Sequence, residues 1–430
     1  MQNIVRIFAF VLIAALCAPA NAEISDDGYI TYIVKRGDTL IDMSKRYLNT
    51  PNSYRVVQQQ NKIRDPQAMP VGRPIRIARN LLKYEAATAK LISVRGNVLI
   101  GTSAASAGQT IGEGTTLKTA ESSFVTLSLP NGSRVSLPSN SNLRIRLLRT
   151  YTLGGALDYD FDVTKGGAST SVTPLKSADD RYRVRTPRAV SAVRGTDFQV
   201  RYDDQTDRDF AEVIEGGLAV TTGTNADTAL PAGNGMAVPQ SGAVIKEALL
   251  PEPKLIEPGK VQVNPELLFT VDPRANEKGY RLTWATDAGF LEQVADVSIA
   301  GQEAKLAGIG DGNYFVRARA ISENGIQGIP VTHAFKRRLN GVKASAGAGD
   351  DGFSFKWQSE GQGVRKFHFQ MFKGEPNGAA MIDEPALVDP QIIISDLPPG
   401  NYFWRVGAVQ FAGSEVATNW TSFEKLAVAP

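Results

Sequence analysis

The fold of the central part of this chain is indicated by one stretch, Val184-Arg185-Thr186-Pro187-Arg188-Ala189-Val190-Ser191-Ala192-Val193-Arg194-Gly195-Thr196-Asp197-Phe198. Pro187 has no backbone donor and disfavours helix at Thr186, whereas Gly195 can take positive φ between two strands. The stretch therefore predicts an extended segment, a turn and a second strand, and it contains no catalytic group. We interpret Arg194-Gly195-Thr196 as a β-turn with a buried or capped arginine rather than as a partner-binding element.

Alternating apolar segments continue on both sides of this stretch, from Tyr84 to about Leu250. Clusters of Gly, Asn and Ser separate them at intervals that suit a β-sandwich or a β-helix-like stack. Within this region, Pro130-Asn131-Gly132-Ser133 predicts a hairpin.

The same region resembles FecR-type domains. The resemblance is carried by the words Thr-Pro-x-Ala-Val-x-Ala-Val-Arg-Gly-Thr-x-Phe in the opening stretch and by Glu215-Gly216-Gly217, which matches the family pattern Val-x-Glu-Gly. It implies a β-rich FecR domain over residues 84–250. FecR domains elsewhere relay the state of an outer-membrane receptor to a sigma factor, which would need a membrane helix and a cytoplasmic segment. We find neither in this sequence and expect at most the partner-sensing half of that role.

The N-terminus predicts export. Arg6 precedes an apolar run from Ile7 to Cys17 that is too short to span a bilayer, and Ala20-Asn21-Ala22 fits signal peptidase cleavage. We therefore predict a signal peptide at residues 1–22 and a periplasmic or envelope-associated protein. Leu16 disfavours lipoprotein processing at Cys17. The mature chain would have 408 residues (430 minus 22), no cysteine and no later membrane span.

A basic module follows at residues 29–83. Between Tyr29 and Lys83 we count 11 Lys and Arg against 3 Asp, a local balance of +8, although the whole chain carries only +3. The module should therefore favour an anionic partner surface. Its pattern predicts a strand from Tyr32, a helix capped by Thr39, a second helix over residues 53–61 and a closing strand at residues 75–77.

This module resembles a LysM domain in the words Tyr-x-Val-x-x-Gly-Asp-Thr-Leu, in Gln60-Asn61 and in the turn from Met69 to Gly72. LysM domains bind peptidoglycan or other N-acetylglucosamine-containing glycans in a shallow groove. Carried over by motif, the resemblance implies a groove lined by Gly37, Asp38, Thr39, Leu40, Asn61, Lys62, Ile63, Met69 and Val71. Ile41 departs from the family, in which many members carry an aromatic residue. Turn and cap chemistry is an alternative role for Asp38 and Thr39.

Asp158, Asp160 and Asp162 alternate with apolar residues along one predicted strand. Three carboxylates on one face could bind calcium, but the 12-residue helix-loop-helix calcium frame is absent. We favour a solvated strand face that pairs with arginines on neighbouring strands, since Arg144 with Arg146, and Arg181 with Arg183 and Arg185, show the same alternation with opposite charge.

The C-terminal part begins with a predicted proline-rich linker at residues 251–265, poor in strand signals. An internal repeat follows, because Asp311-Gly312-Asn313-Tyr314-Phe315-Val316-Arg317 recurs 88 residues later as Pro399-Gly400-Asn401-Tyr402-Phe403-Trp404-Arg405. Both copies, residues 266–339 and 340–430, resemble fibronectin type III-like sandwiches. We expect their aromatic residues to form sandwich cores rather than a sugar platform.

Composition and residue types argue against an enzyme. The chain has two histidines, His333 and His368, one in each predicted sandwich, so neither a nucleophile–histidine pair nor a histidine metal site has its parts in one module. We expect no catalytic residues, cofactor or metal ion. A net charge of +3 and 42% apolar residues indicate a globular, mainly β multidomain protein that does not bind nucleic acid.

Three functions fit these features. The first is a non-catalytic peptidoglycan-binding envelope protein that presents its FecR and sandwich domains to a protein or glycan partner. The second is a periplasmic sensing or regulatory component of FecR type. The third is an adhesin or structural spacer built from tandem sandwiches.

Overall fold

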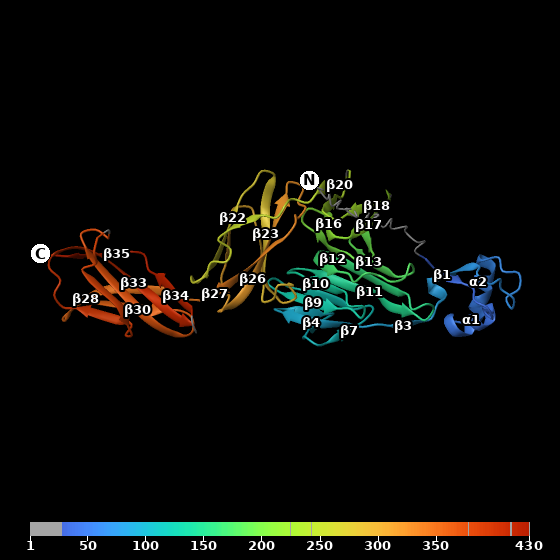
Figure 1. Ribbon diagram of the computed structural model, residues 1–430, viewed down its shortest axis with the longest axis horizontal. Coiled ribbons are helices and arrows are strands. Elements are labelled where there is room, and N and C mark those ends of the chain that lie inside the picture. Colours follow the sequence, from blue (N-terminus) through green and yellow to red (C-terminus); the bar gives the residue numbers. More distant parts are fainter. Residues whose placement is uncertain (1–27, 224, 242, 377, 413–414, 430) are drawn as a thin grey trace, which may run out of the picture. The chain divides into compact units, whose positions relative to one another are not determined.

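The computed structural model describes residues 28–223, 225–241, 243–376, 378–412 and 415–429, which form mainly β-strands (Figure 1). The predicted signal peptide lies outside the described residues. One compact unit ends at Leu81 and a second begins at Leu82. In the described part of the chain, every helix is too short or too polar to span a membrane. The predicted mainly β multidomain class is confirmed.

The N-terminal module has the order strand, helix, helix, strand. Strands β1 (Tyr29–Ile33) and β2 (Pro74–Ala78) pair antiparallel, and between them lie α1 (Leu40–Tyr47), the 3-10 turn η1 (Pro51–Ser53) and α2 (Tyr54–Gln60); η2 (Arg79–Leu81) follows. The Thr39 hydroxyl accepts the backbone N–H of Asp42 at 3.0 Å, so the predicted helix cap is confirmed. The module buries a small apolar core that includes Leu40, Met43, Val57, Ile75 and Ile77.

The second unit begins with a β-rich central domain, whose strands are β3 (Tyr84–Ala86), β4 (Ala89–Arg95), β5 (Val98–Ile100), β6 (Ser103–Ala104), β7 (Thr110–Ile111), β8 (Thr116–Thr119), β9 (Phe124–Ser128), β10 (Arg134–Leu137), β11 (Asn142–Tyr151), β12 (Leu157–Ser171), β13 (Arg181–Arg185), β14 (Ala189–Val193), β15 (Asp197–Asp203), β16 (Arg208–Glu215), β17 (Gly217–Thr222), β18 (Asn225–Pro231), β19 (Asn234–Val238) and β20 (Ile245–Ala248). Their pairings form a closed barrel. The predicted hairpin at Asn131-Gly132 is confirmed, since it joins antiparallel β9 and β10.

Strand β12 connects two parts of this domain. Its first half pairs with β11 and with parallel β13, and its second half pairs with β10 and β15. The change of partner occurs at Gly166, which has φ +67° and whose absent Cβ would stand 2.6 Å from the Asn140 carbonyl oxygen. Glycine is therefore needed at this bend.

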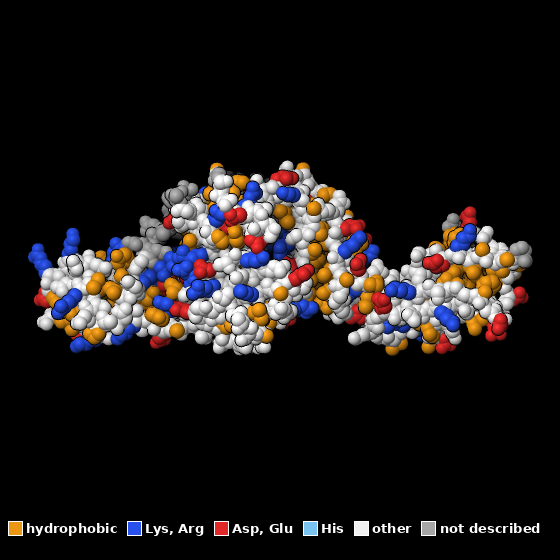
Figure 2. Space-filling model, turned by 180° about the vertical axis from the view of Figure 1, so that it is seen from behind, with side chains coloured by type: hydrophobic (Ala, Val, Ile, Leu, Met, Phe, Trp, Pro, Cys, Tyr) orange, Lys and Arg blue, Asp and Glu red, His pale blue; other side chains and the backbone are white. Residues whose placement is uncertain are grey.

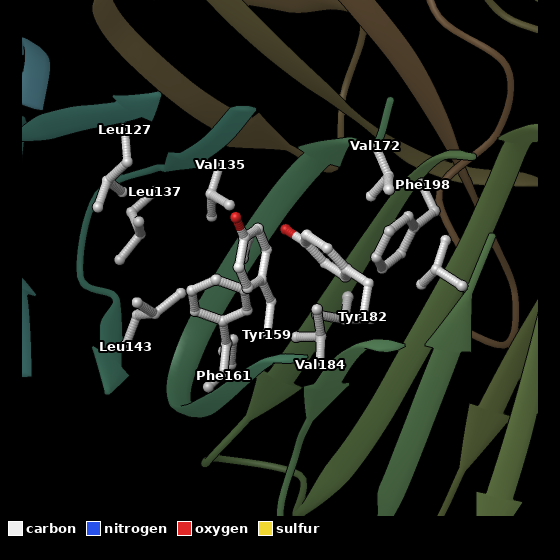
Figure 3. Packing of buried hydrophobic residues seen from close by; sticks show 14 of the residues in the cluster. Leu127, Val135, Leu137, Leu143, Tyr159, Phe161, Val172, Tyr182, Val184 and Phe198 are labelled. Atoms are coloured by element: carbon white, nitrogen blue, oxygen red, sulfur yellow. The ribbon is translucent and has the colours of Figure 1, made fainter. Parts of the chain in front are cut away.

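The core of the central domain is aromatic at its centre (Figure 3). Tyr159, Phe161 and Tyr182 are fully buried, with ring centroids of Phe161 and Tyr182 5.4 Å apart. The hydroxyls of Tyr159 and Tyr182 have no hydrogen-bond partner among the described side chains and backbone. Burial raises the pKa of Tyr159 to about 12, so this hydroxyl stays protonated at neutral pH.

The first sandwich consists of β21 (Lys254–Ile256), β22 (Leu267–Asp272) and β25 (Glu303–Leu306) in one sheet, and β24 (Gln293–Ile299), β23 (Glu277–Ala285), β26 (Gly312–Ser322) and β27 (Val331–Arg337) in the other. The predicted linker at residues 251–265, although poor in strand signals, contains β21, which pairs with β22. Buried Arg337 also binds the linker, donating to the carbonyl oxygens of Asn264 and Pro265, the latter at 2.9 Å. These contacts make the segment part of the sandwich.

The second sandwich pairs β28 (Val342–Gly349), β29 (Gly352–Ser359) and β32 (Gln391–Ile394) in one sheet; the other contains β30 (Val364–Lys373), β31 (Ile382–Leu387), β33 (Gly400–Ala412), β34 (Glu415–Trp420) and β35 (Glu424–Val428). Tyr402 is fully buried and donates to the Pro398 carbonyl oxygen at 2.6 Å. Phe355, Phe369 and Trp404 pack in the same core, so the expectation of core aromatics is confirmed for these residues. Figure 2 also shows hydrophobic side chains gathered on one face of this domain.

Candidate functional sites

Five of the residues predicted to line a glycan groove have structural roles in the N-terminal module. Leu40, Ile63 and Met69 are buried in its core. The Asp38 carboxylate accepts the Tyr32 hydroxyl and the Lys35 backbone N–H, both at 2.7 Å. The Asn61 side chain donates to the carbonyl oxygen of Arg76 and accepts its N–H, also at 2.7 Å each. These interactions hold the two loops that would border a groove.

The other predicted groove residues are more accessible. Lys62 is exposed, Val71 is 65% exposed, Thr39 is half-buried, and no atom lies within 4 Å of the position that a Cβ would take at Gly37. The two loops are joined where the Leu40 N–H donates to the Pro66 carbonyl oxygen at 2.8 Å. A ligand would therefore meet mainly backbone, Lys62 and Val71. Lys and Arg side chains also stand on the face of this module in Figure 2.

The acidic strand of the central domain pairs with arginines, as predicted. Arg181 Nε lies 2.7 Å from Asp158 Oδ1, and Arg183 and Arg185 both bind Asp160, at 2.5 and 2.9 Å. The expectation of a solvated face is wrong for Asp158 and Asp160, which are 0% and 1% exposed. The parallel pairing of β12 with β13 buries these charges together. In the described part of the chain, no group of three or more His, Cys, Asp or Glu residues is placed to hold a metal ion.

The glycine turn of the opening stretch interlocks with a second glycine turn. Gly195 has φ +114°, which confirms the predicted positive φ, and a Cβ there would stand 2.9 Å from Pro174 Cα. A Cβ at Gly216 would stand 2.6 Å from the Gly195 carbonyl oxygen. Arg194 is exposed and donates to the Ala178 carbonyl oxygen at 2.5 Å, so it caps a neighbouring loop. The prediction of a turn with a capped arginine is confirmed.

The loop between β26 and β27 docks on the central domain. Its Ile326 is 1% exposed and packs against Phe210, Ala237 and Leu249 in a small apolar cluster. A Cβ at Gly235 would overlap the Ile326 side chain, so glycine is required opposite it. This apolar contact joins the first sandwich to the central domain.

A buried carboxylate completes this joint. Glu212 is 0% exposed, and its Oε1 accepts the Gln327 backbone N–H at 3.1 Å and Arg201 Nη2 at 2.7 Å. Arg201 Nη2 also donates to the Gly325 carbonyl oxygen at 2.8 Å. Removing the carboxylate would leave a buried guanidinium without its counterion, which is strongly destabilising.

Beside the joint, arginines face each other across two strands of the first sandwich. The register of β23 and β26 places Arg281 opposite Arg319, and Thr283 opposite Arg317. Arg281 forms an ion pair with Asp296. Arg317 stacks on the Phe290 ring, 3.8 Å from its centroid, and Arg319 donates to the Gly328 carbonyl oxygen at 3.1 Å. Among the described residues, Arg317 and Arg319 have no carboxylate at ion-pair distance.

The arginines line a cavity of about 490 Å³ between the central domain and the first sandwich. Desolvation by burial lowers the pKa of Arg281 and of Arg317. It lowers the pKa of Arg319 to about 10, to which the neighbouring charges of Arg317, Arg201 and Arg281 contribute. Since guanidinium groups stay protonated in proteins, the three arginines place positive charge in surroundings that disfavour it.

The sequence patterns did not predict this cavity. Arg317 and Arg405 occupy equivalent places in the 88-residue repeat and were treated only as part of the sandwich pattern. The alternation of Arg317 with Arg319 on one strand was a usable signal, because it puts two guanidiniums on one face. The apposition of the two domains could not be inferred from that pattern.

The chain is thus a mainly β, multidomain protein with a cavity of ligand size between the central domain and the first sandwich. Residues 115–219 match the family model described as FecR protein. The matched residues lie within the central domain and include the interlocked glycine turns. A comparison with curated proteins gave no match.

Solved structures show weak similarity. A Parabacteroides distasonis protein, whose description proposes an anti-sigma factor, is 19% identical with a TM-score of 0.27, over 31% of this chain and 59% of that one. This chain thus spans about three fifths of that protein. The chicken CNTN1 FN1–FN3 domains are 12% identical with a TM-score of 0.24, over 67% of this chain and 98% of theirs. A two-domain fibronectin type III segment of chicken tenascin is 14% identical with a TM-score of 0.21, over 41% and 97%.

Proposed function

We propose that this protein is a non-catalytic sensing or regulatory component of the cell envelope, of FecR type, exported to the periplasm. The observation that carries the proposal is the FecR match at residues 115–219. The matched region includes Glu212, whose carboxylate holds the loop of the first sandwich. A partner that binds differently to the docked and undocked arrangements would shift the balance between them. Such a relay requires no catalytic residue.

The test compares transcripts in a strain of the source organism that lacks the gene with those in strains complemented by the wild type or by Glu212→Ala. A regulatory component predicts that a defined gene set changes on deletion, is restored by the wild type and is not restored by Glu212→Ala. Immunoblots must show equal amounts of both proteins. Unchanged transcripts together with altered adhesion or envelope integrity would instead favour the adhesin or spacer function.

We also propose that the N-terminal module binds peptidoglycan or a related N-acetylglucosamine-containing glycan. Its strand-helix-helix-strand order and its two joined loops support this second function. The exposed positions Lys62 and Val71 lie on the predicted groove loops, and backbone N–H and C=O groups suit amide and hydroxyl recognition. Affinity from one shallow site should be modest, so the module would serve as an anchor beside the sensing domains.

A further inference from the structure

We propose that the cavity between the central domain and the first sandwich binds an acidic saccharide, through a carboxylate or phosphate group held by Arg317 and Arg319. This inference goes beyond the sensing role and does not depend on it. Three observations carry it: the unequal pairing of charges in the cavity, its size, and the hydroxyl and amide groups around the arginines.

The first observation concerns the charges. Three cations of the lining are paired, Arg201 with Glu212, Arg281 with Asp296, and Lys165 with Asp204. Two further acids also line the cavity. Glu121 is exposed to solvent, and Asp203 already accepts the Gln205 N–H at 2.9 Å and the Thr206 hydroxyl at 2.7 Å.

The two remaining guanidiniums have no acid at ion-pair distance among the described residues, although the more distant charges of Asp287 and Asp197 act on Arg317 and that of Glu212 acts on Arg319. Arg317 is fixed by the Phe290 ring and by Thr332 Oγ1 at 3.3 Å, and Arg319 by the Gly328 carbonyl oxygen. Neutral partners orient these groups but do not cancel their charge, and Arg281 stands directly across the sheet from Arg319. Like charges opposite each other are unfavourable. An external anion would remove this repulsion and find guanidinium N–H groups suited to bidentate binding.

The second and third observations define the rest of the ligand. A volume of about 490 Å³ lies within the range of small-molecule sites, roughly 300 to 1,000 Å³, and excludes a folded domain. The walls near the arginines carry hydroxyls and amides, among them Ser169, Gln199, Thr283, Gln293 and Ser298. Such groups both donate and accept hydrogen bonds, as sugar hydroxyls do. A ligand with acidic groups on a hydroxyl-rich frame could bind both the arginines and the hydroxyl and amide side chains that line the cavity.

Titration calorimetry on the mature chain tests this proposal with four probes: trigalacturonic acid, glucose 1-phosphate, neutral maltotriose and triglutamate. We expect one or both acidic sugars to bind and maltotriose not to bind. Which of them binds distinguishes a carboxylate from a phosphate. Equal binding of maltotriose would show that the arginines are not used, and binding of triglutamate alone would assign the cavity to acidic peptides. Either result, or no binding of any probe at millimolar concentration, overturns the proposal.

The decisive variant is Thr283→Glu, because Thr283 stands opposite Arg317 on the neighbouring strand. The new carboxylate would form an ion pair with the Arg317 guanidinium and compete with the anionic ligand, while all arginines are kept. We expect it to weaken binding about tenfold or more, whereas Thr283→Gln, whose side chain matches glutamate in size but carries no charge, measures the effect of the lost hydroxyl and the added bulk and should weaken binding much less. Arg405→Gln is a second control, since Arg405 also stacks on an aromatic ring, that of Trp420 at 4.2 Å, but lies in the second sandwich. Unchanged affinity of Thr283→Glu would place the ligand elsewhere.

Discussion

The side-chain hydroxyl of Thr196 and the backbone of Gly217 exchange two hydrogen bonds: Thr196 Oγ1 donates to the Gly217 carbonyl oxygen at 2.9 Å and accepts its N–H at 3.3 Å. Thr196 is 4% exposed, whereas Gly217 is exposed, so these hydrogen bonds are partly buried. It joins the turn before β15 to the turn before β17. The Arg-Gly-Thr and Glu-Gly-Gly words of the sequence are therefore two halves of one structural unit.

This pair predicts the behaviour of two substitutions at Thr196. Thr196→Val keeps the shape but removes both hydrogen bonds to Gly217, and should lower the free energy of unfolding of the central domain by about 1 to 3 kcal/mol, since each bond contributes roughly 0.5 to 1.5 kcal/mol. Thr196→Ser keeps the hydroxyl and should cost less. Urea denaturation of residues 82–250 measures both, provided the wild-type fragment first shows a cooperative transition. Equal losses for Val and Ser would refute a role for the hydroxyl.

Gly195 gives a second prediction. Gly195→Val should destabilise the central domain by about 1 to 3 kcal/mol, because a β-branched residue is strained at positive φ; the φ there is +114°. Gly112→Val is the matched control, since Gly112 lies outside that φ range and its nearest neighbour stands 3.8 Å from the Cβ position. A melting temperature of Gly195→Val within error of that control would contradict the turn geometry.

A third prediction concerns where the first sandwich begins. A fragment from Pro251 to Pro430 keeps β21 and the carbonyl oxygens that Arg337 binds, whereas a fragment from Pro265 loses β21 and the Asn264 carbonyl. We expect the shorter fragment to melt at least about 2 to 4 °C lower, the shift that corresponds to 1 kcal/mol at this size. Both fragments lack the central domain and expose the same docking loop between β26 and β27. Calorimetry on the two therefore isolates the effect of residues 251–264. Equal melting temperatures would restore the linker interpretation.

Tyr402 tests the core of the second sandwich. Tyr402→Ala should cost about 2 to 4 kcal/mol by leaving a cavity, and Tyr402→Phe about 1 kcal/mol by removing the hydrogen bond to Pro398. The change should appear in amide hydrogen exchange of β33, which carries Tyr402, and of β30 and β35, which flank it, and leave the first sandwich unaffected. Full stability of Tyr402→Ala with loss of binding to a glycan or envelope partner would make Tyr402 a recognition residue.

Glycan anchoring is tested at an exposed groove position. Val71→Asp should reduce co-sedimentation of the mature chain with peptidoglycan sacculi several-fold, since it places a charge where a sugar face would pack. Val56→Asp is the control: Val56 is 43% exposed and lies on α2, and it is not one of the predicted groove residues. Equal sedimentation of both variants, with unchanged circular dichroism, would argue against the groove.

Local sequence determined the elements of this protein and several of their details. The period of apolar residues predicts the strands because a strand turns alternate side chains to opposite faces. Thr39 predicts a helix start and Gly195 a turn because caps and positive φ depend on a few adjacent residues. The alternating Asp and Arg residues likewise predict cross-strand pairing, which is observed.

The tertiary structure decided what lies between elements that are distant in the sequence. Three features depend on which strands and domains pack against each other. They are the burial of Asp158 and Asp160, the hydrogen bonds from Arg337 to the segment before the first sandwich, and the cavity around Arg319. No local pattern encodes that the Ile326 loop reaches Glu212, more than one hundred residues earlier in the chain. Local propensities act within a few residues, whereas the pairing of charges and the exclusion of water depend on contacts that exist only once the domains have packed.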